Sequence, residues 1–140
     1  MKRAAFTMIE LIFIIVVVGI LAGVALPKIF FTRDDAMITK ARTQIVAIQS
    51  AISAKFNESL MSGGGAVYPN SLEGSNASLL FDGVLVQGIK PAANESSSGW
   101  RNVGNTYTIR ISTRSTSFTY NATDGSFTCD DEGLCEELTQ

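Results

Sequence analysis

The 140-residue sequence predicts an α+β protein, in which a long N-terminal helix packs on a small antiparallel sheet of about three to four strands. Three observations lead to this prediction. An apolar run near the N-terminus continues into a stripe of apolar residues at helical spacing. A glycine-rich segment then ends the helical pattern. Residues 106–129 finally alternate between apolar and polar side chains, which is typical of half-buried strands.

Composition limits the possible functions. Residues 1–56 hold seven basic and three acidic residues, a net charge of +4, whereas residues 57–140 hold four and ten, a net charge of −6. The chain has no histidine, which excludes histidine-based acid–base catalysis and makes most zinc sites unattainable. No phosphate-binding loop or catalytic dyad is present in the sequence. We therefore expect a protein that is not an enzyme and that holds no cofactor.

The apolar run from Phe6 to Leu26 has 21 residues, close to the ~20 that a helix needs to cross a bilayer. Lys2 and Arg3 precede it and are expected on the cytoplasmic side. One interpretation is a secretory signal peptide that is removed near Gly23, and another is a permanent membrane anchor. Neither interpretation accounts for Glu10. Inserting a carboxylate costs on the order of 3 kcal/mol at the bilayer centre and less near the edge, where it is still stabilised only by a partner.

A third interpretation rests on a resemblance. The residues that carry it are Lys2, Arg3, Phe6, Thr7, Glu10, the apolar run, Gly19 and Pro27. Together they resemble the N-terminus of type IV prepilins, which type IV pilins share with the pseudopilins of type II secretion. The resemblance implies that a leader, residues 1–5, is cut off by the prepilin peptidase between Ala5 and Phe6, and that Phe6 is then N-methylated. The family usually has glycine before the cut, so Ala5 is a departure, but alanine is small and we expect processing to occur.

The same segment predicts how subunits assemble. Cleavage exposes a positive amine on Phe6, one helical turn from Glu10, and in a staggered filament the Glu10 of one subunit can meet the Phe6 amine of its neighbour. Two buried opposite charges then satisfy each other. Gly19, Gly23 and Pro27 recur every four residues on one helix face, a spacing that allows close approach of membrane helices. The resemblance implies that this stretch melts when the subunit enters a filament, with ordinary packing glycines and a kink as the alternative.

The long helix is predicted in two parts, an apolar transmembrane and assembly part over residues 6–27 and an amphipathic part over residues 28–61. The apolar stripe of the second part consists of Ile38, Ala41, Ile45, Ile48, Ile52 and Phe56. Thr32 and Asp35 match a capping box, which could start a new helix, but one continuous helix is the preferred interpretation. The stripe is expected to pack on the protein's own sheet, with a coiled-coil seam as the alternative.

Residues 62–140 are predicted to form a globular head. A loop over 62–105 contains two short apolar pieces, one around Leu80 that suggests a strand, and one around Trp100, which is expected to anchor the core or a hinge, with a binding platform as the alternative. The sheet follows over 106–129, with strands from Thr106 to Ser112, from Ser117 to Ala122 and from Ser126 to Cys129. A tight turn at Asp124-Gly125 joins the last two of these strands.

The last segment, residues 129–140, is expected to be closed by a disulfide between Cys129 and Cys135, the only two cysteines. A pair so close in a chain with an export segment favours a disulfide, which would contribute roughly 2–2.5 kcal/mol. Half of a metal site and a redox-active pair are the alternatives. A calcium site like that of some major pseudopilins has its candidates in Asp124, Asp130, Asp131 and Glu132. Their spacing matches no known calcium loop, so we expect no metal and a solvated acidic tail.

The resemblance implies a pilin-like fold and a pseudopilin, a structural subunit that assembles through its N-terminal helix into an inner-membrane-anchored periplasmic pseudopilus for type II protein secretion or DNA uptake. A major or minor pilin of a surface type IV pilus is the alternative, and a fixed membrane-anchored periplasmic binding protein is an alternative of another class. The implied partners are other pilin-like subunits, the prepilin peptidase and methylase, the inner-membrane assembly platform and membrane lipid, with nucleic acid only in a DNA-uptake system. The implied location is the bacterial inner membrane, crossed once, with the N-terminus cytoplasmic and the head periplasmic, and afterwards a periplasmic or surface filament.

Overall fold

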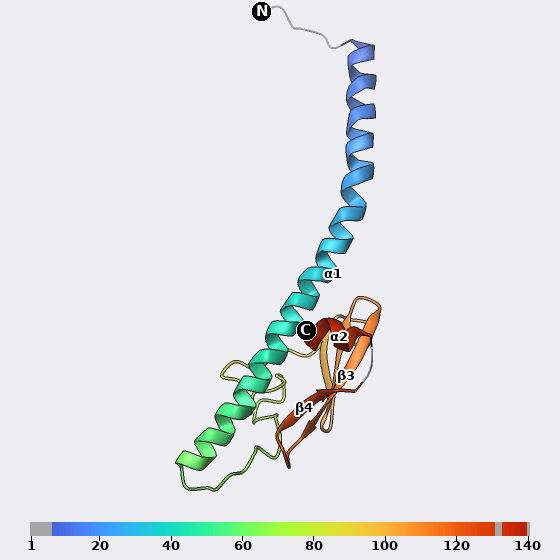
Figure 1. The fold of residues 1–140 in the computed structure, drawn as a ribbon. Helices are drawn as coiled ribbons and strands as arrows, with labels where there is room; N and C mark the ends of the chain where they lie inside the picture. Colours follow the sequence, from blue (N-terminus) through green and yellow to red (C-terminus); the bar gives the residue numbers. More distant parts are fainter. Residues whose placement is uncertain (1–6, 131–132, 140) are drawn as a thin grey trace, which may run out of the picture. The chain divides into compact units, whose positions relative to one another are not determined.

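The computed structural model describes residues 7–130 and 133–139, and the side chains of residues 25–32 lie outside this description. The elements follow one another as a long helix, four strands and a short helix (Figure 1). The chain divides into two compact units, residues 1–36 and residues 37–140. The first unit contains the N-terminal part of helix α1, and the second contains the rest of α1 and all the other elements.

Helix α1 runs without a break from Met8 to Met61. Thr32 and Asp35 lie within it, so the preferred interpretation of one continuous helix is confirmed and the new start at Thr32 is wrong. No glycine or proline occurs between residues 28 and 61 to interrupt the hydrogen-bond ladder. The helix ends where Gly63 adopts a φ of 77°, a left-handed conformation that glycine takes at little cost.

The sheet is an antiparallel meander with the strand order β1-β2-β3-β4. Its strands are β1 (Gly99–Val103), β2 (Thr106–Ile111), β3 (Arg114–Asn121) and β4 (Ser126–Cys129). The expected antiparallel sheet is therefore confirmed with four strands. Strand β3 begins three residues earlier than predicted, because Arg114 pairs with Ile111 across a tight hairpin.

Two expectations for the segment before the sheet need correction. The piece around Trp100 forms β1, so the loop predicted over 62–105 ends at residue 98. The piece around Leu80 forms no strand and makes only a single bridge, between Leu80 and Ile89. The reason is local, since the chain turns at residues 82–84 and the Gly83 amide bonds the Leu72 carbonyl oxygen instead of a strand partner.

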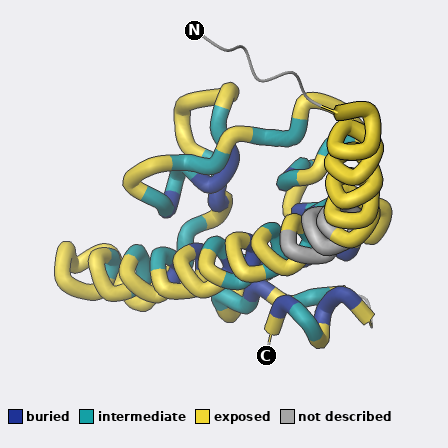
Figure 2. The backbone as a smooth tube through the Cα atoms, turned by 90° about the horizontal axis from the view of Figure 1, so that it is seen from above, coloured by how far each residue is buried: buried dark blue, intermediate teal, exposed yellow. Residues whose placement is uncertain are grey.

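The core of the second unit lies between α1 and one face of the sheet. The predicted stripe supplies its helical side, since Ala41, Ile45, Ile48 and Ile52 are all buried, and buried segments recur along this part of α1 (Figure 2). Every second residue of β2 and β3 faces the same core, as the pattern of burial along both strands records. Trp100 is 1% exposed and its Nε1 donates a hydrogen bond to Gln44 of α1, which confirms it as a core anchor.

Phe81, from the loop before the sheet, lies in the middle of the aromatic part of this core. It stacks on Tyr107, with ring centroids 4.4 Å apart, and meets Trp100 edge-on at 5.5 Å. Its φ is 61°, which is unusual for a bulky residue and is tolerated here because the side chain is fully buried among these rings. Burial raises the pKa of Tyr107, and the neighbouring Glu73 carboxylate raises it further.

Candidate functional site

The N-terminal part of α1 is exposed along its described length (Figure 2), and nearly all the side chains there are apolar. Thirteen large hydrophobic residues between Met8 and Val24 are exposed, with fractions from 37% for Val17 to 77% for Met8. Soluble domains rarely leave so continuous an apolar surface in water, and one of this extent marks a site of interaction. Among the residues that the structure describes, no helix meets the length and hydropathy required of a membrane span.

Thr7 and Glu10 define the start of this helix. The Thr7 hydroxyl accepts a hydrogen bond from the Glu10 amide at 3.3 Å, and the Thr7 carbonyl accepts one from the Leu11 amide at 3.2 Å. Thr7 is thus the N-cap and Glu10 the third helical residue, the Thr-x-x-Glu arrangement of a capping box. The Thr-x-x-acid signal occurs in the sequence both at Thr7 and at Thr32, and the structure shows that only Thr7 starts a helix, a role that the sequence prediction does not assign to it.

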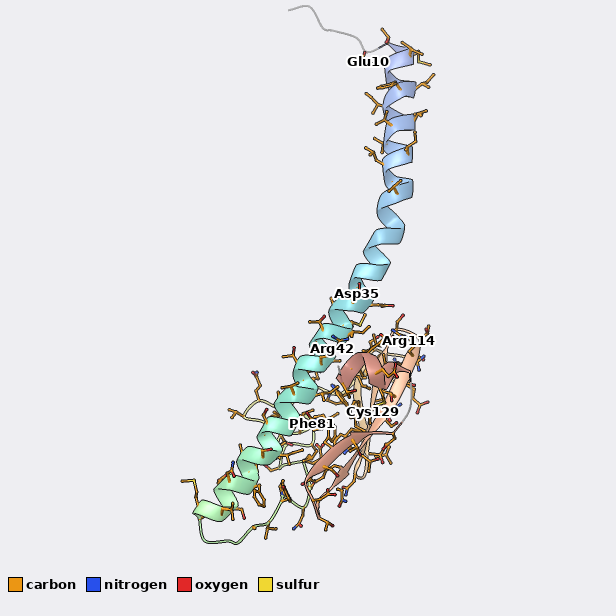
Figure 3. The ribbon with its side chains drawn as sticks, viewed as in Figure 1. Glu10, Asp35, Arg42, Phe81, Arg114 and Cys129 are labelled. Carbon is orange, nitrogen blue, oxygen red and sulfur yellow. A yellow bond between two sulfur atoms is a disulfide. The ribbon has the colours of Figure 1, made fainter. Side chains whose placement is uncertain are left out.

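The Glu10 carboxylate is exposed at the first turn of the helix (Figure 3). No basic side chain of the described chain lies within ion-pair distance of it. A carboxylate at this end of a helix is favoured by the helix dipole, and the residue remains available to a positive group from outside. The predicted processing residues Ala5 and Phe6 lie outside the described residues, as does the leader, so the predicted pairing with a Phe6 amine stays a prediction.

Gly19 and Gly23 lie within the regular part of α1. A methyl group added at either position would meet nothing within 4 Å. The isolated chain therefore gives no packing reason for glycine at either position. Pro27 belongs to the same helix, but its side chain lies outside the described residues, and the predicted melting between Gly19 and Pro27 is untested.

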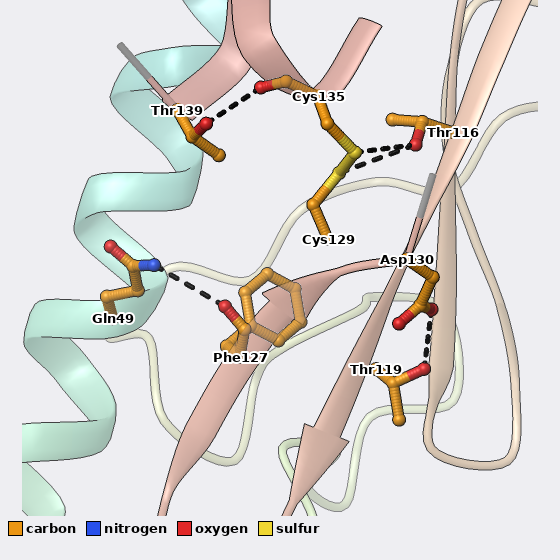
Figure 4. Close-up of a disulfide and its surroundings, with 8 residues drawn as sticks. All are labelled: Gln49, Thr116, Thr119, Phe127, Cys129, Asp130, Cys135 and Thr139. Atoms are coloured by element: carbon orange, nitrogen blue, oxygen red, sulfur yellow. Dashed lines mark hydrogen bonds between the residues drawn. A yellow bond between two sulfur atoms is a disulfide. The ribbon is translucent and has the colours of Figure 1, made fainter. Parts of the chain in front are cut away.

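The disulfide between Cys129 and Cys135 is present, as predicted, with the two Cα atoms 5.9 Å apart (Figure 4). It joins the end of β4 to helix α2 (Leu134–Thr139). The buried Thr116 hydroxyl lies 3.1 Å from the Cys135 sulfur and 3.4 Å from the Cys129 sulfur, so β3 contacts both ends of the bridge. Leu134 and Leu138 of α2 are buried in the core.

Charged groups hold the other side of α2. The Arg114 guanidinium binds both carboxylate oxygens of Glu137, at 2.6 and 3.1 Å, and Arg42 of α1 donates a hydrogen bond to the Glu137 carbonyl oxygen (Figure 3). The hydrogen bonds from Arg114 lower the pKa of Glu137 below its ordinary value. Helix α2 is thereby tied to both α1 and β3.

The calcium candidates do not converge in the part of the chain that is described. Hydrogen bonds from the Ser126 side chain and from the Ser126 amide, the latter at 2.9 Å, lower the pKa of Asp124, whereas Asp130 accepts a hydrogen bond from Thr119 at 2.6 Å. Asp131 and Glu132 lie outside the described residues. No group of three potential metal ligands occurs among the residues whose placement is described.

Comparisons with known proteins identify similar chains. Three curated relatives share the name Type II secretion system core protein G. The relative from Pseudomonas aeruginosa is 28% identical over 103 residues, which cover 74% of this chain and 62% of the relative. The relative from Vibrio cholerae is 32% identical over 77 residues, 54% of this chain and 48% of the relative. The relative from Escherichia coli is 33% identical over 51 residues, 36% of this chain and 35% of the relative.

No family model matches the chain, and no solved structure matches it. The chain spans less than two thirds of the length of each of the three relatives. The long helix, the antiparallel sheet and the C-terminal disulfide are consistent with a pilin-like α+β fold. The three similarities support the family that the N-terminal residues indicate, the pseudopilins of type II secretion among the type IV pilin-like proteins.

Proposed function

We propose that the chain is a pseudopilin, a structural subunit that polymerises through the N-terminal part of α1 into a periplasmic filament serving type II protein secretion. The observation that carries the proposal is the exposed apolar surface from Met8 to Val24, interrupted by a single carboxylate. Such a surface needs an apolar environment all round, which is lipid before assembly and the helices of neighbouring subunits afterwards. The name shared by the three relatives favours secretion over a surface pilus.

The proposed sequence of events begins in the inner membrane, with the head on the periplasmic side. The prepilin peptidase cuts between Ala5 and Phe6, and the new Phe6 amine is methylated. Glu10, exposed and without a basic partner in the described chain, then pairs with the Phe6 amine of a neighbouring subunit. The pair fixes the register of assembly, because an unpaired charge in an apolar filament core is strongly disfavoured.

A second observation, made at Gly19 and Gly23, supports the same proposal. Side chains would fit at both positions in the isolated chain, so the two glycines serve contacts with neighbouring helices. The role is structural rather than catalytic, and the partners are other pilin-like subunits, the processing enzyme, the assembly platform and lipid. Nucleic acid enters only if the filament belongs to a DNA-uptake machine.

Mass spectrometry of the N-terminus tests the first step. We expect a mature chain that begins with methylated Phe6, and a chain that retains Met1 in the presence of the peptidase would refute the proposal. The Glu10→Ala variant tests the second step, and we expect normal or improved membrane insertion with loss of filament incorporation.

Glu10→Gln separates charge from helix capping, because glutamine also fits the third position of a capping box. We expect it to fail in assembly as alanine does. Glu58→Gln, on the same helix but far along the sequence, is the matched control and should assemble normally. Normal filaments from Glu10→Ala would contradict the proposed pairing.

A further inference from the structure

A groove runs along α1 within the second unit of the structure. Two adjoining cavities, of about 210 and 440 Å³, form it and share the residues Lys40, Gln44, Ile89 and Lys90. One wall is α1 from Met37 to Ala47, and the opposite wall is the chain around residues 85–92. Buried apolar residues form the floor of the smaller cavity, namely Ala41, Trp100, Ile109 and Ile111.

The groove is positively charged. Lys40, Lys90 and Arg110 line it, and no acidic residue lines either cavity. Elsewhere in residues 37–140, Lys55 pairs with Glu58, Arg101 with Glu95 and Arg114 with Glu137, and Arg42 binds the Glu137 carbonyl oxygen. Among the described residues of this unit, Lys40, Lys90 and Arg110 are in no ion pair, and Arg110 donates a hydrogen bond to the Ser112 carbonyl oxygen.

The complementary charge lies at the C-terminal end. Residues 130–140 contain five acidic residues and no basic one. Two of these, Asp130 and Glu136, are described as exposed, and no described basic side chain pairs with either. The acidic edge, defined here by Asp130 and Glu136, therefore has the opposite charge to the groove, and neither of its carboxylates is in an ion pair with a described basic side chain, although Asp130 accepts a hydrogen bond from Thr119.

The groove and the acidic edge lie on different sides of the same unit. Lys40 and Arg42 are two residues apart on α1 and so point about 200° apart around the helix axis. Lys40 faces the groove, whereas Arg42 contacts α2. The sheet also places the groove and the acidic edge apart. Strands β1 and β2 line the groove, whereas α2 and the disulfide lie against β3 and β4.

We propose that the groove of one subunit receives the acidic edge of a second copy of this chain, with Lys40, Lys90 and Arg110 facing Asp130 and Glu136. The two surfaces differ and lie on different sides, so each copy can offer both at once. Contacts of this heterologous kind continue from subunit to subunit and generate open helical filaments. The proposal rests on the proposed function, to which it adds a contact between heads that is independent of Phe6 and Glu10.

Carbodiimide cross-linking tests this contact directly, because the reagent joins an amine to a carboxylate only where the two touch. Filaments of the full chain are assembled from a mixture of isotope-labelled and unlabelled subunits, treated, digested and analysed by mass spectrometry. We expect a mixed-isotope product that joins Lys40 or Lys90 to Asp130 or Glu136. Lys90→Gln together with Lys40→Gln should abolish it, whereas the matched control Lys55→Gln should leave it unchanged.

A charge exchange provides the second arm of the test. Lys90→Glu should reduce the yield of filaments, and Lys90→Glu combined with Glu136→Lys should restore it. Filaments that form without the mixed-isotope product, or that join Lys40 and Lys90 to other carboxylates, would refute the head contact and leave the proposed function intact. A processed wild-type chain that forms no filament would refute both.

Discussion

Removal of the Cys129–Cys135 disulfide should destabilise the head. The bridge joins residues six apart and ties α2 to the end of β4. It also provides the two sulfur atoms beside the Thr116 hydroxyl, whose residue is 3% exposed. Two effects are therefore expected, one from the covalent link and one from the buried hydroxyl.

The chain-entropy relation gives about 2.4 kcal/mol for a loop of this length. That is a large part of the 5–15 kcal/mol typical of a whole domain. Cys129→Ala with Cys135→Ala also leaves Thr116 without its sulfur partners, which adds about 1 kcal/mol, near the lower end for an unsatisfied buried group because sulfur is a weak acceptor. Cys129→Ser with Cys135→Ser removes the link but offers new hydroxyl partners, so this pair isolates the link.

Trp100 provides the assay, since it is the single tryptophan and is 1% exposed in the core. Its fluorescence during urea unfolding of the full chain in detergent gives the free energy of unfolding for the wild type, the reduced wild type and both double variants. We expect the free energy of unfolding to be highest for the oxidised wild type, lower for the reduced chain and the serine variant, and lowest for the alanine variant. Oxidised and reduced wild type that agree within about 0.5 kcal/mol would refute the chain-entropy account.

Three further predictions use the same assay. Ile48→Ala, at a side chain with 0% exposure, should lower the free energy of unfolding by about 2–5 kcal/mol. Val46→Ala, on the exposed side of the same helix, should lower it by less than about 0.5 kcal/mol. Equal losses of stability would contradict the packing of this stripe. Gly125→Ala should destabilise more than Gly104→Ala, because both glycines have positive φ but only at Gly125 would a new Cβ lie 2.2 Å from the Tyr68 ring; the reverse order would contradict this. Arg114 lowers the pKa of Glu137 from its ordinary 4.5, so the stability that this carboxylate contributes should be present above that pH and lost as the pH falls below it. Glu137→Gln should make the unfolding midpoint less dependent on pH in that acidic range, and an unchanged dependence would mean that the Arg114 pair contributes nothing.

The elements with a regular period could be predicted from the sequence. The spacing of Ile45, Ile48 and Ile52 predicts a helix face because a helix repeats every 3.6 residues. The residues of β2 predict a strand because apolar and polar side chains alternate strictly along it. The disulfide was predictable because the only two cysteines follow the last strand at close spacing. In each case the signal is local, so neighbouring residues in the sequence carry enough information.

The segment from Leu72 to Ile89 was not predictable in the same way. Its apolar residues suggested a strand, but Phe81 enters the core from a left-handed turn. The contacts that hold it there are specific and come from outside the local pattern, including the Glu73 carboxylate, which accepts a hydrogen bond from the Phe81 amide at 3.3 Å. Asp82 similarly accepts hydrogen bonds from the amides of Asn76 and Gly74, which lower its pKa. The groove depends on this segment, so it too was invisible in the sequence.

Glu10 shows how a local and a non-local explanation can apply to one residue. The position of Thr7 as N-cap gives the carboxylate a favourable place at the start of α1, worth about 0.3–1 kcal/mol through the helix dipole. That gain is small beside the cost of an unpaired charge in an apolar filament core, which can exceed 3 kcal/mol. Capping alone therefore explains why Glu10 is stable at a helix end, but it does not explain a charge within a segment that is proposed to enter a filament. Under the proposed function, a positive partner from a second subunit would supply the missing stabilisation, and for this reason we expect substitutions at Glu10 to change assembly rather than folding.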